Sequence, residues 1–327
     1  RQPPGFERGS KVCKLNKSLY GLKQAPRSWN ERFNQFILKL GFKRSPYDCC
    51  LYTKVTKDVK LYLVLYVDDI VLASNSLEEL KNVKVQLAKE FEMEDLEELR
   101  NFLGLKIERD VEKGTLTINQ SQYVSGLLKR FGMDQCKPLG TPLEANVKLA
   151  RKKDEEAVTE HPYRELIGCL TYLMLSSRPD ISIAVNFLSR FQSAATDTHW
   201  IHLKRVLRYL QGTKEFSLEY KRSETADPLV GFADADWGSD IDDRRSTSGF
   251  VFKVFGNTVS WTSRKQATVS LSSTEAEYVS LSQAACESIW LMNLLSDFGI
   301  ALDAPAVIHE DNQSCIHIAE EPRDQKR

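Results

Sequence analysis

The stretch KLYLVLYVDDIVLAS, residues 60–74, decides the fold prediction. Two apolar runs rich in Val, Leu, Ile and Tyr flank the adjacent carboxylates Asp68 and Asp69. Runs of this length and composition are typical of buried strands, and the polar pair between them predicts a tight hairpin turn. Aspartate is also common in plain turns, because its side chain hydrogen-bonds nearby backbone. Two repelling carboxylates at the tip of an apolar hairpin also fit a site for a hard cation such as Mg²⁺.

Composition is that of a globular protein, with 42% hydrophobic and 28% charged residues in 327 positions. This length has room for about two or three domains. The sequence has no apolar run near the roughly 20 residues that span a bilayer, so we expect no membrane partner. Seven scattered cysteines without a CxxC pattern indicate reduced thiols in an intracellular protein. Because residue 1 is Arg rather than Met, we expect a piece of a longer polypeptide.

Charge is unevenly distributed although the formal net charge is zero. Residues 1–60 hold 14 Lys and Arg against 4 Asp and Glu, whereas residues 223–327 hold 8 against 17. A basic segment ahead of an acidic one suits a protein that binds a polyanion and holds cations at carboxylates. Ordinary surface variation produces such blocks as well.

The residues before the hairpin predict a helix preceded by a basic loop. Apolar residues recur at helical spacing after Pro26, and Gly41 ends the pattern. The loop GLKQAPR, residues 21–27, places Lys23, Gln24 and backbone donors at the start of this helix, an end that favours phosphate. A basic loop without a ligand is the alternative.

The segments after the hairpin predict an α+β layer followed by helices. A helix is expected over 77–91, strands over 102–109 and 115–120, and further helices over 120–131, 163–176, 180–193 and 199–211. Residues 136–160 have little apolar pattern and predict a solvated linker.

The acidic last third predicts three antiparallel strands, a helix, a strand and a helix. Asp234 ends the first strand, Glu275 begins the helix at 272–295, and Asp311 follows the strand at 305–309. If the fourth strand pairs beside the first, these three carboxylates converge as in a two-metal phosphodiester site. Capping offers another explanation, since Glu275 or Glu277 fits a capping box and Asp311 an N-cap.

Six segments in this order resemble the polymerase region of copia-type LTR retrotransposons. They are KLNKSLYGLKQAPRSW (14–29), YVDD (66–69), FLGLKIER (102–109), RRSTSGF (244–250), SSTEAEY (272–278) and EDNQS (310–314). The resemblance covers essentially the whole chain. It implies a reverse transcriptase palm over 1–118, a helical thumb or connection over 119–222 that includes the linker 136–160, and a ribonuclease H-like mixed α/β domain over 223–327.

The resemblance also implies roles for single residues. Asp68 and Asp69 would hold Mg²⁺ (or Mn²⁺) for nucleotidyl transfer, and Tyr66 would lie under the primer terminus. Tyr20 and Gly21 would lie by the incoming dNTP, with Lys23 and Gln24 near it or the template. Three acids would serve as the catalytic, metal-binding carboxylates of ribonuclease H: Asp234, Glu275 and Asp311.

The partners implied by the resemblance are an RNA template, a DNA primer, RNA–DNA hybrid, dNTPs and the rest of a Pol polyprotein, in a cytoplasmic virus-like particle. One family carboxylate of each site has no counterpart in this sequence. We therefore expect the chain alone to be catalytically weak, by about a thousandfold or more. A remnant that binds nucleic acid without chemistry is the competing interpretation.

Overall fold

The structure is a computed structural model that describes residues 5–12, 14–19, 21–145, 147–151, 156–302 and 304–321. The described part contains eight α-helices and three four-stranded sheets, a mixed α/β architecture. It divides into two compact units, Arg1–Leu96 with Asn293–Ala301, and Glu97–Met292 with Leu302–Arg327. Each unit is described by itself below.

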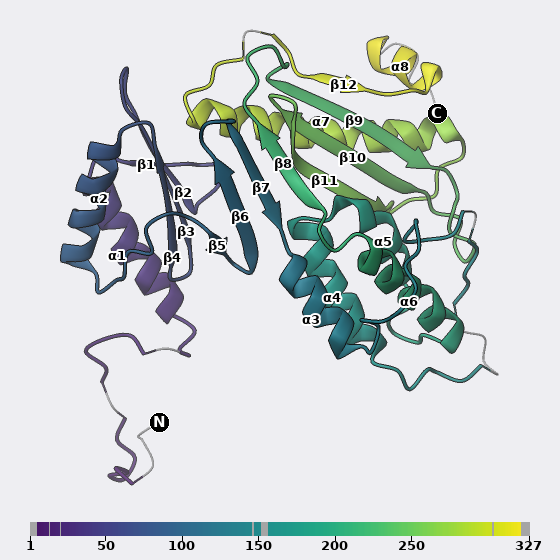
Figure 1. Cartoon of the computed structure of the whole chain (residues 1–327), viewed down its shortest axis with the longest axis horizontal. Coiled ribbons are helices and arrows are strands. Elements are labelled where there is room, and N and C mark those ends of the chain that lie inside the picture. Colours follow the sequence, from purple (N-terminus) through teal and green to yellow (C-terminus); the bar gives the residue numbers. More distant parts are fainter. Residues whose placement is uncertain are drawn as a thin grey trace. The chain divides into compact units, whose positions relative to one another are not determined.

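The first unit is a four-stranded sheet with two helices packed on one face (Figure 1). The sheet has the order β1-β2-β3-β4, and each neighbouring pair is antiparallel. The elements are α1 (Ala25–Lys39), β1 (Lys43–Arg44), β2 (Leu51–Val55), β3 (Lys60–Tyr66), β4 (Asp69–Ser74) and α2 (Leu77–Glu90). The predicted first helix and hairpin are confirmed.

Strand β3 alternates between two environments because successive side chains of a strand point to opposite faces. Leu61, Leu63 and Leu65 are buried in the core shared with α1 and α2. The intervening Tyr62 donates its hydroxyl to the carbonyl of Phe298, at 2.7 Å, and the two rings meet edge to face. Residues 293–301, far along the sequence, therefore complete the first unit.

The second unit begins with a sheet of order β5-β6-β7-β8. Its strands are β5 (Asn101–Phe102), β6 (Leu105–Asp110), β7 (Thr115–Asn119) and β8 (Ser217–Lys221). The prediction of one strand over 102–109 is wrong, because Leu103 and Gly104 have φ of +50° and +76° and turn the chain between β5 and β6.

Helices form the middle of the second unit. They are α3 (Ser121–Arg130), α4 (Tyr163–Ser176), the 3₁₀ turn η1 (Pro179–Ile181), α5 (Ser182–Ser189) and α6 (Asp197–Gly212). Their apolar faces enclose one core. The described part of the predicted linker 136–160 forms no helix or strand, but it is not solvated throughout. Leu149 is buried in this core, Leu143 and Val147 pack against it, and the N–H of Leu139 donates to the carbonyl of Arg208.

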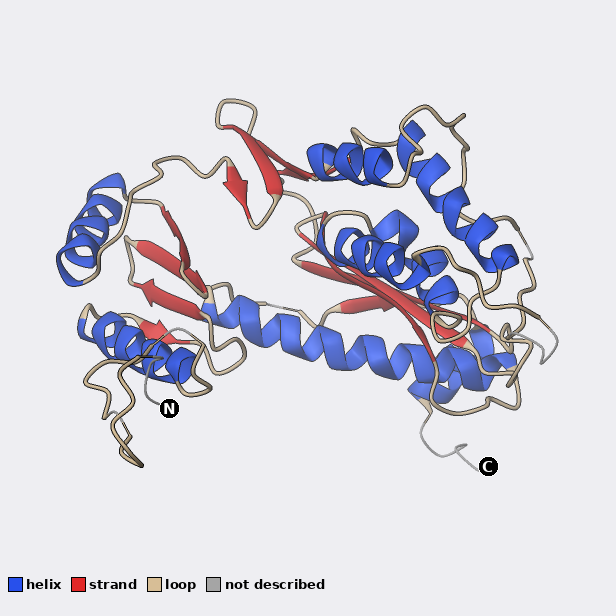
Figure 2. Ribbon diagram, turned by 90° about the horizontal axis from the view of Figure 1, so that it is seen from below, coloured by secondary structure: helices blue, strands red, loops and turns tan. Residues whose placement is uncertain are grey.

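The third sheet has the order β11-β10-β9-β12. Its elements, with the helices that follow, are β9 (Leu229–Asp236), β10 (Thr247–Val254), β11 (Asn257–Lys265), α7 (Ser273–Asp297), β12 (Val307–His309) and α8 (Gln313–Glu320). β12 pairs parallel with β9, which is the condition stated above for Asp234 and Asp311 to meet. In Figure 2 this sheet lies between the long helix α7 and the group of shorter helices.

The two units do not follow the three predicted segments 1–118, 119–222 and 223–327, because β8 joins the sheet of β5 to β7 and residues 293–301 join the first unit. The three-segment division stays a prediction. Within the described residues, no helix is both long enough and apolar enough to cross a bilayer.

Candidate functional site

Three carboxylates converge at one end of the third sheet. Asp234, Glu277 and Asp311 each offer an oxygen, and these oxygens all lie within 4.8 Å of one another. Asp234 lies on β9, Asp311 follows β12, and Glu277 lies on α7. Parallel pairing of β12 with β9 brings the two aspartates to the same edge of the sheet.

The sequence of β9 explains why Asp234 faces away from the core. Gly231, Ala233 and Ala235 are buried, whereas Phe232, Asp234 and Asp236 are exposed. Small residues on the buried face let neighbouring elements approach closely, and an added Cβ at Gly231 would lie 2.4 Å from the Phe252 ring. Ser280 of α7 donates its hydroxyl to the carbonyl of Asp234 at 2.8 Å, which ties the helix to the strand beside the cluster.

Glu277 is the buried member of the cluster, with 7% of its surface exposed. Burial, with the charges of Glu310, Asp234 and Asp311, raises the pKa of Glu277 to about 7. Its Oε2 atom is buried and accepts no hydrogen bond. Burial also raises the pKa of Glu310, whose Oε2 is likewise buried without a partner. Divalent cations such as Mg²⁺ bind carboxylate oxygens, and a cation here would compensate the charge of these acids and bind the oxygens that have no hydrogen-bond partner.

The prediction that Glu275 joins Asp234 and Asp311 is wrong in geometry. Glu275 lies in the first turn of α7, where its Oε2 accepts the N–H of Leu271 at 2.8 Å and its own N–H donates to Ser272. The Ser272 hydroxyl therefore caps the first turn of α7, and the Glu275 carboxylate bonds to the backbone before the helix instead of joining the cluster.

A helical repeat in the sequence could have selected Glu277 in its place. The buried residues of α7 begin with the adjacent pair Ala276 and Glu277 and then recur at spacings of three and four: Ser280, Ala284, Ser288, Leu291 and Leu295. Glu275 is outside this series, so it cannot share the face that packs on the sheet.

The hairpin of β3 and β4 places Asp68 and Asp69 at its tip, as predicted. Tyr66 pairs with Asp69, so Val67 and Asp68 form a two-residue connection. Tyr66, Asp68 and Asp69 are all exposed. Among the described residues, no third metal-ligating side chain joins the two aspartates, and the remaining three-residue group, Asp48 with Cys49 and Cys50, consists of neighbours in one turn.

The loop before α1 holds the other predicted polymerase residues. Gly21 has a φ of +90°, Lys23 is exposed, and Gln24 is the N-cap residue of α1, without a capping bond from its side chain. Tyr20 lies outside the described residues. Trp29 was not predicted as a site residue, yet its indole N–H donates to the carbonyl of Val67 at 2.9 Å, which connects α1 to the hairpin tip.

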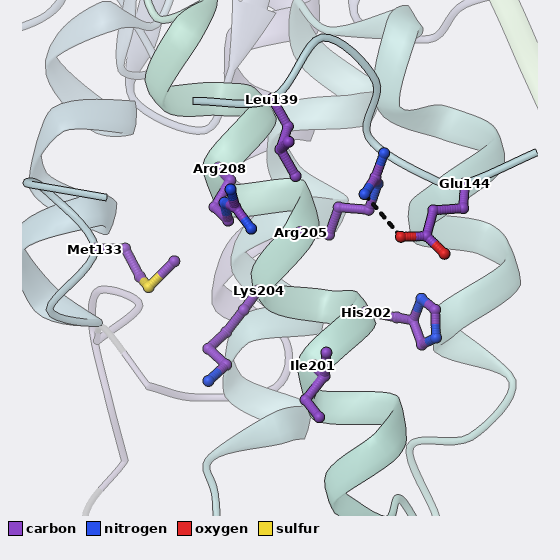
Figure 3. A pocket seen from close by; sticks show the side chains of 8 residues that line it. All are labelled: Met133, Leu139, Glu144, Ile201, His202, Lys204, Arg205 and Arg208. Carbon is purple, nitrogen blue, oxygen red and sulfur yellow. Dashed lines mark hydrogen bonds and ion pairs between the residues drawn. The ribbon is translucent and has the colours of Figure 1, made fainter. Parts of the chain in front are cut away.

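A basic pocket of about 270 Å³ lies beside α6 in the second unit (Figure 3). It is lined by Met133, Leu139, Glu144, Ile201, His202, Lys204, Arg205 and Arg208. Arg205 is held by Glu144 and Thr141, each at 2.9 Å, and Arg208 donates its Nε to the carbonyl of Lys137. Cationic side chains therefore surround an apolar floor, with one acid among them.

Comparison with known proteins identifies the family of this chain. Residues 1–145 match the family described as "Reverse transcriptase (RNA-dependent DNA polymerase)". The chain is 39% identical to the retrovirus-related Pol polyprotein from transposon TNT 1-94 of Nicotiana tabacum, over 97% of this chain and 24% of that protein. It is 40% identical to the Pol polyprotein from transposon RE1 of Arabidopsis thaliana, over 98% of this chain and 22% of that protein.

A shorter relative is matched almost throughout. The transposon Ty5-1 protein YCL074W of Saccharomyces cerevisiae is 35% identical over 88% of this chain and 94% of its own length.

The mixed α/β architecture and the first 145 residues thus define a protein of the reverse transcriptase class. The chain belongs to the family of Pol polyproteins from copia-type retrotransposons. It spans about a quarter of the length of the transposon Pol polyproteins that it matches.

Proposed function

We propose that this chain is part of an RNA-directed DNA polymerase whose second unit carries a ribonuclease H-like site for the RNA strand of RNA–DNA hybrids. Family membership and the match over residues 1–145 support the polymerase. The observation that carries the second activity is the cluster of Asp234, Glu277 and Asp311, with a buried, unpartnered carboxylate oxygen.

Asp234, Glu277 and Asp311 would hold Mg²⁺, or Mn²⁺ in its place. Bound divalent cations activate a water nucleophile and stabilise the leaving oxygen in phosphodiester hydrolysis. Glu277 binds a cation as the carboxylate, so near neutral pH the cation displaces the proton that the raised pKa of about 7 keeps on part of the molecules. Asp234 and Asp311 are exposed and leave one side of the cluster open to a nucleic-acid strand.

Asp68 and Asp69 would hold the cations of nucleotidyl transfer at the hairpin tip. Gly21, Lys23 and Gln24 would contact the incoming dNTP or the template near the start of α1, together with Tyr20, and Tyr66 would lie under the primer terminus. Exposure of the two aspartates and of Lys23 supports this assignment, because their groups are available to substrate.

The basic pocket beside α6 would contact the phosphate backbone of the template–primer or hybrid. The side chains of Lys204 and His202 make no ion pair or hydrogen bond in the described part of the chain, so they are available to an anion. A contact of this kind is electrostatic and weakens steeply with salt. The remaining partner is the rest of the Pol polyprotein.

Binding of a fluorescently labelled RNA–DNA hybrid tests the proposed function without depending on turnover. Anisotropy would be compared in Ca²⁺ and in a chelator with Asp68→Asn and Asp69→Asn as the background, for that background alone and with Glu277→Gln or Glu275→Gln added. We expect Ca²⁺ to tighten binding several-fold for the background and with Glu275→Gln, and not with Glu277→Gln. Equal tightening in all three would contradict a cation site at Glu277.

A further inference from the structure

Trp29 makes a hydrogen bond that reaches from α1 to the hairpin tip. Its indole N–H donates to the carbonyl oxygen of Val67 at 2.9 Å, across 38 positions of sequence. Within the described residues, no other hydrogen bond reaches Val67 or Asp68 from outside the hairpin. Residue 67 immediately precedes the two aspartates.

Val67 has a backbone conformation that needs support. Its φ is +54°, in the left-handed region that a β-branched residue rarely adopts. Its side chain is 64% exposed, so burial does not hold it in place. Strained residues persist where their surroundings fix them, and the bond from Trp29 to the Val67 carbonyl is a contact of that kind.

Trp29 is itself held in place by an aromatic cluster. Its ring meets Phe91 edge to face, with ring centroids 5.3 Å apart, and lies 5.7 Å from the ring of Phe33. Phe33 is completely buried in the core of the first unit. The indole N–H therefore comes from a side chain whose orientation is fixed by packing, which is the support that a precise site needs.

We infer that Trp29 is a positioning residue for Asp68 and Asp69. By fixing the carbonyl of Val67, it holds the tip in the left-handed conformation and sets the direction in which the two aspartate side chains project from the hairpin. This inference rests on the proposed function, in which the tip binds divalent cations.

The test is a Mn²⁺ titration followed at the methyl group of Ile70, which directly follows Asp69. Isoleucine methyl groups of the whole chain are ¹³C-labelled, the Ile70 signal is assigned with Ile70→Val, and its paramagnetic broadening gives the local affinity. Trp29→Phe keeps an aromatic ring and loses the N–H. Loss of one hydrogen bond predicts about threefold to tenfold weaker Mn²⁺ affinity at the tip.

Val67→Gly separates positioning from general stability. Glycine adopts a positive φ without a side-chain penalty, so Trp29→Phe in the Val67→Gly background is expected to weaken Mn²⁺ affinity less than about twofold. The same fold-loss in both backgrounds, or no loss in either, would overturn the inference. Trp261→Phe is the matched control. It removes an indole bond of 2.7 Å to Met174 in the second unit and is expected to leave the Ile70 titration unchanged.

The double variant Asp68→Asn with Asp69→Asn distinguishes failure of the proposed function from failure of the inference about Trp29. If Ile70 broadens equally without both aspartates, or does not broaden in the unchanged chain, the cation site fails and the inference fails with it. If the broadening requires the two aspartates but is unchanged in Trp29→Phe, only the inference about Trp29 fails.

If Trp29→Phe unfolds the first unit, the inference is tested instead by hydrogen exchange of the Trp29 indole N–H in the unchanged chain. We expect exchange at least about tenfold slower than in free tryptophan, and exchange at the free rate would overturn the inference.

Discussion

Glu277 is a buried carboxylate whose closest charged neighbours are acids. Burial and the charges of Glu310, Asp234 and Asp311 raise its pKa to about 7, against an ordinary value of 4.5. Its Oε2 is buried without a hydrogen bond. Ionisation of this residue therefore costs the fold free energy unless a cation compensates the charge.

Replacing Glu277 with glutamine is expected to stabilise the chain in a chelating buffer at pH 8. At that pH Glu277 is ionised, because its pKa is about 7, and the amide removes the charge while keeping the shape. We expect the free energy of unfolding to rise by about 1–3 kcal/mol. Urea unfolding measures this change. Glu275→Gln is the control and should stay within about 0.5 kcal/mol, and a destabilised Glu277→Gln would contradict the electrostatic interpretation.

Residue identity at the cluster was only partly predictable from sequence. Asp234 and Asp311 follow from strand ends that the apolar pattern locates, and the structure brings both together. Glu275 and Glu277 both fit capping boxes, and the choice between them depends on which helix face packs on the sheet. Trp29 was missed because its bond to Val67 joins residues 38 positions apart.

At the scale of elements, Asp240 joins α5 to the β10–β11 hairpin. Its carboxylate accepts from Arg190, which follows α5, at 3.1 Å, and from Lys265 of β11 at 2.5 Å. Burial alone would raise the pKa of Asp240. Hydrogen bonds from Lys265 and from the backbone of Asp242 and Asp243, with the charge of Lys265, lower it to about 2.

Asp240→Asn is expected to destabilise the chain at pH 7 by about 2 kcal/mol or more. The folded pKa of about 2 lies below the ordinary 3.8, so the carboxylate's contribution is fully present above pH 3.8 and is lost as the pH falls through 2. Denaturant unfolding from pH 7 down to pH 2 measures this effect. Asp240→Asn should show a flatter decline below pH 4 than the unchanged chain, and parallel curves would contradict the assignment.

Most elements were predictable because their apolar periodicity is strong. The helix at Ala25–Lys39 was predicted, and the pairing of β12 with β9 meets the condition stated for Asp234 and Asp311 to converge. Two errors share one cause, which is tertiary packing that local pattern does not encode. Leu103 and Gly104 break an apolar run into two strands. Leu149 is buried although the segment around it has little apolar periodicity.

At the scale of the whole molecule, the first unit is discontinuous in sequence. Tyr62 bonds Phe298 across 236 positions, and Ser45 donates its hydroxyl to Asp297 at 2.5 Å. No local pattern predicts pairs this far apart. The family match supports the polymerase part, whereas the ribonuclease H-like part is our proposal from the motif order and the carboxylate cluster.

The 327-residue chain by itself is expected to be a weak catalyst. Among the described residues the hairpin offers two carboxylates and the cluster three, one fewer at each site than the family resemblance implies, and an electrostatic site that lacks one ligand is slower by about a thousandfold or more. Primer extension and hybrid cleavage with the isolated chain measure both activities. Robust extension that Asp69→Ala abolishes, or robust cleavage that Asp234→Ala abolishes, would contradict the expectation.

Divalent-cation binding by the chain tests the central claim most directly. Calorimetric titration with Mn²⁺ would use Asp68→Asn with Asp69→Asn as the background, so that the hairpin contributes no heat, and would compare Glu277→Gln with Glu275→Gln. We predict that Glu275→Gln keeps the affinity of the background and that Glu277→Gln loses at least about tenfold. Undiminished affinity in Glu277→Gln, or loss in Glu275→Gln alone, would contradict a cation site at Asp234, Glu277 and Asp311.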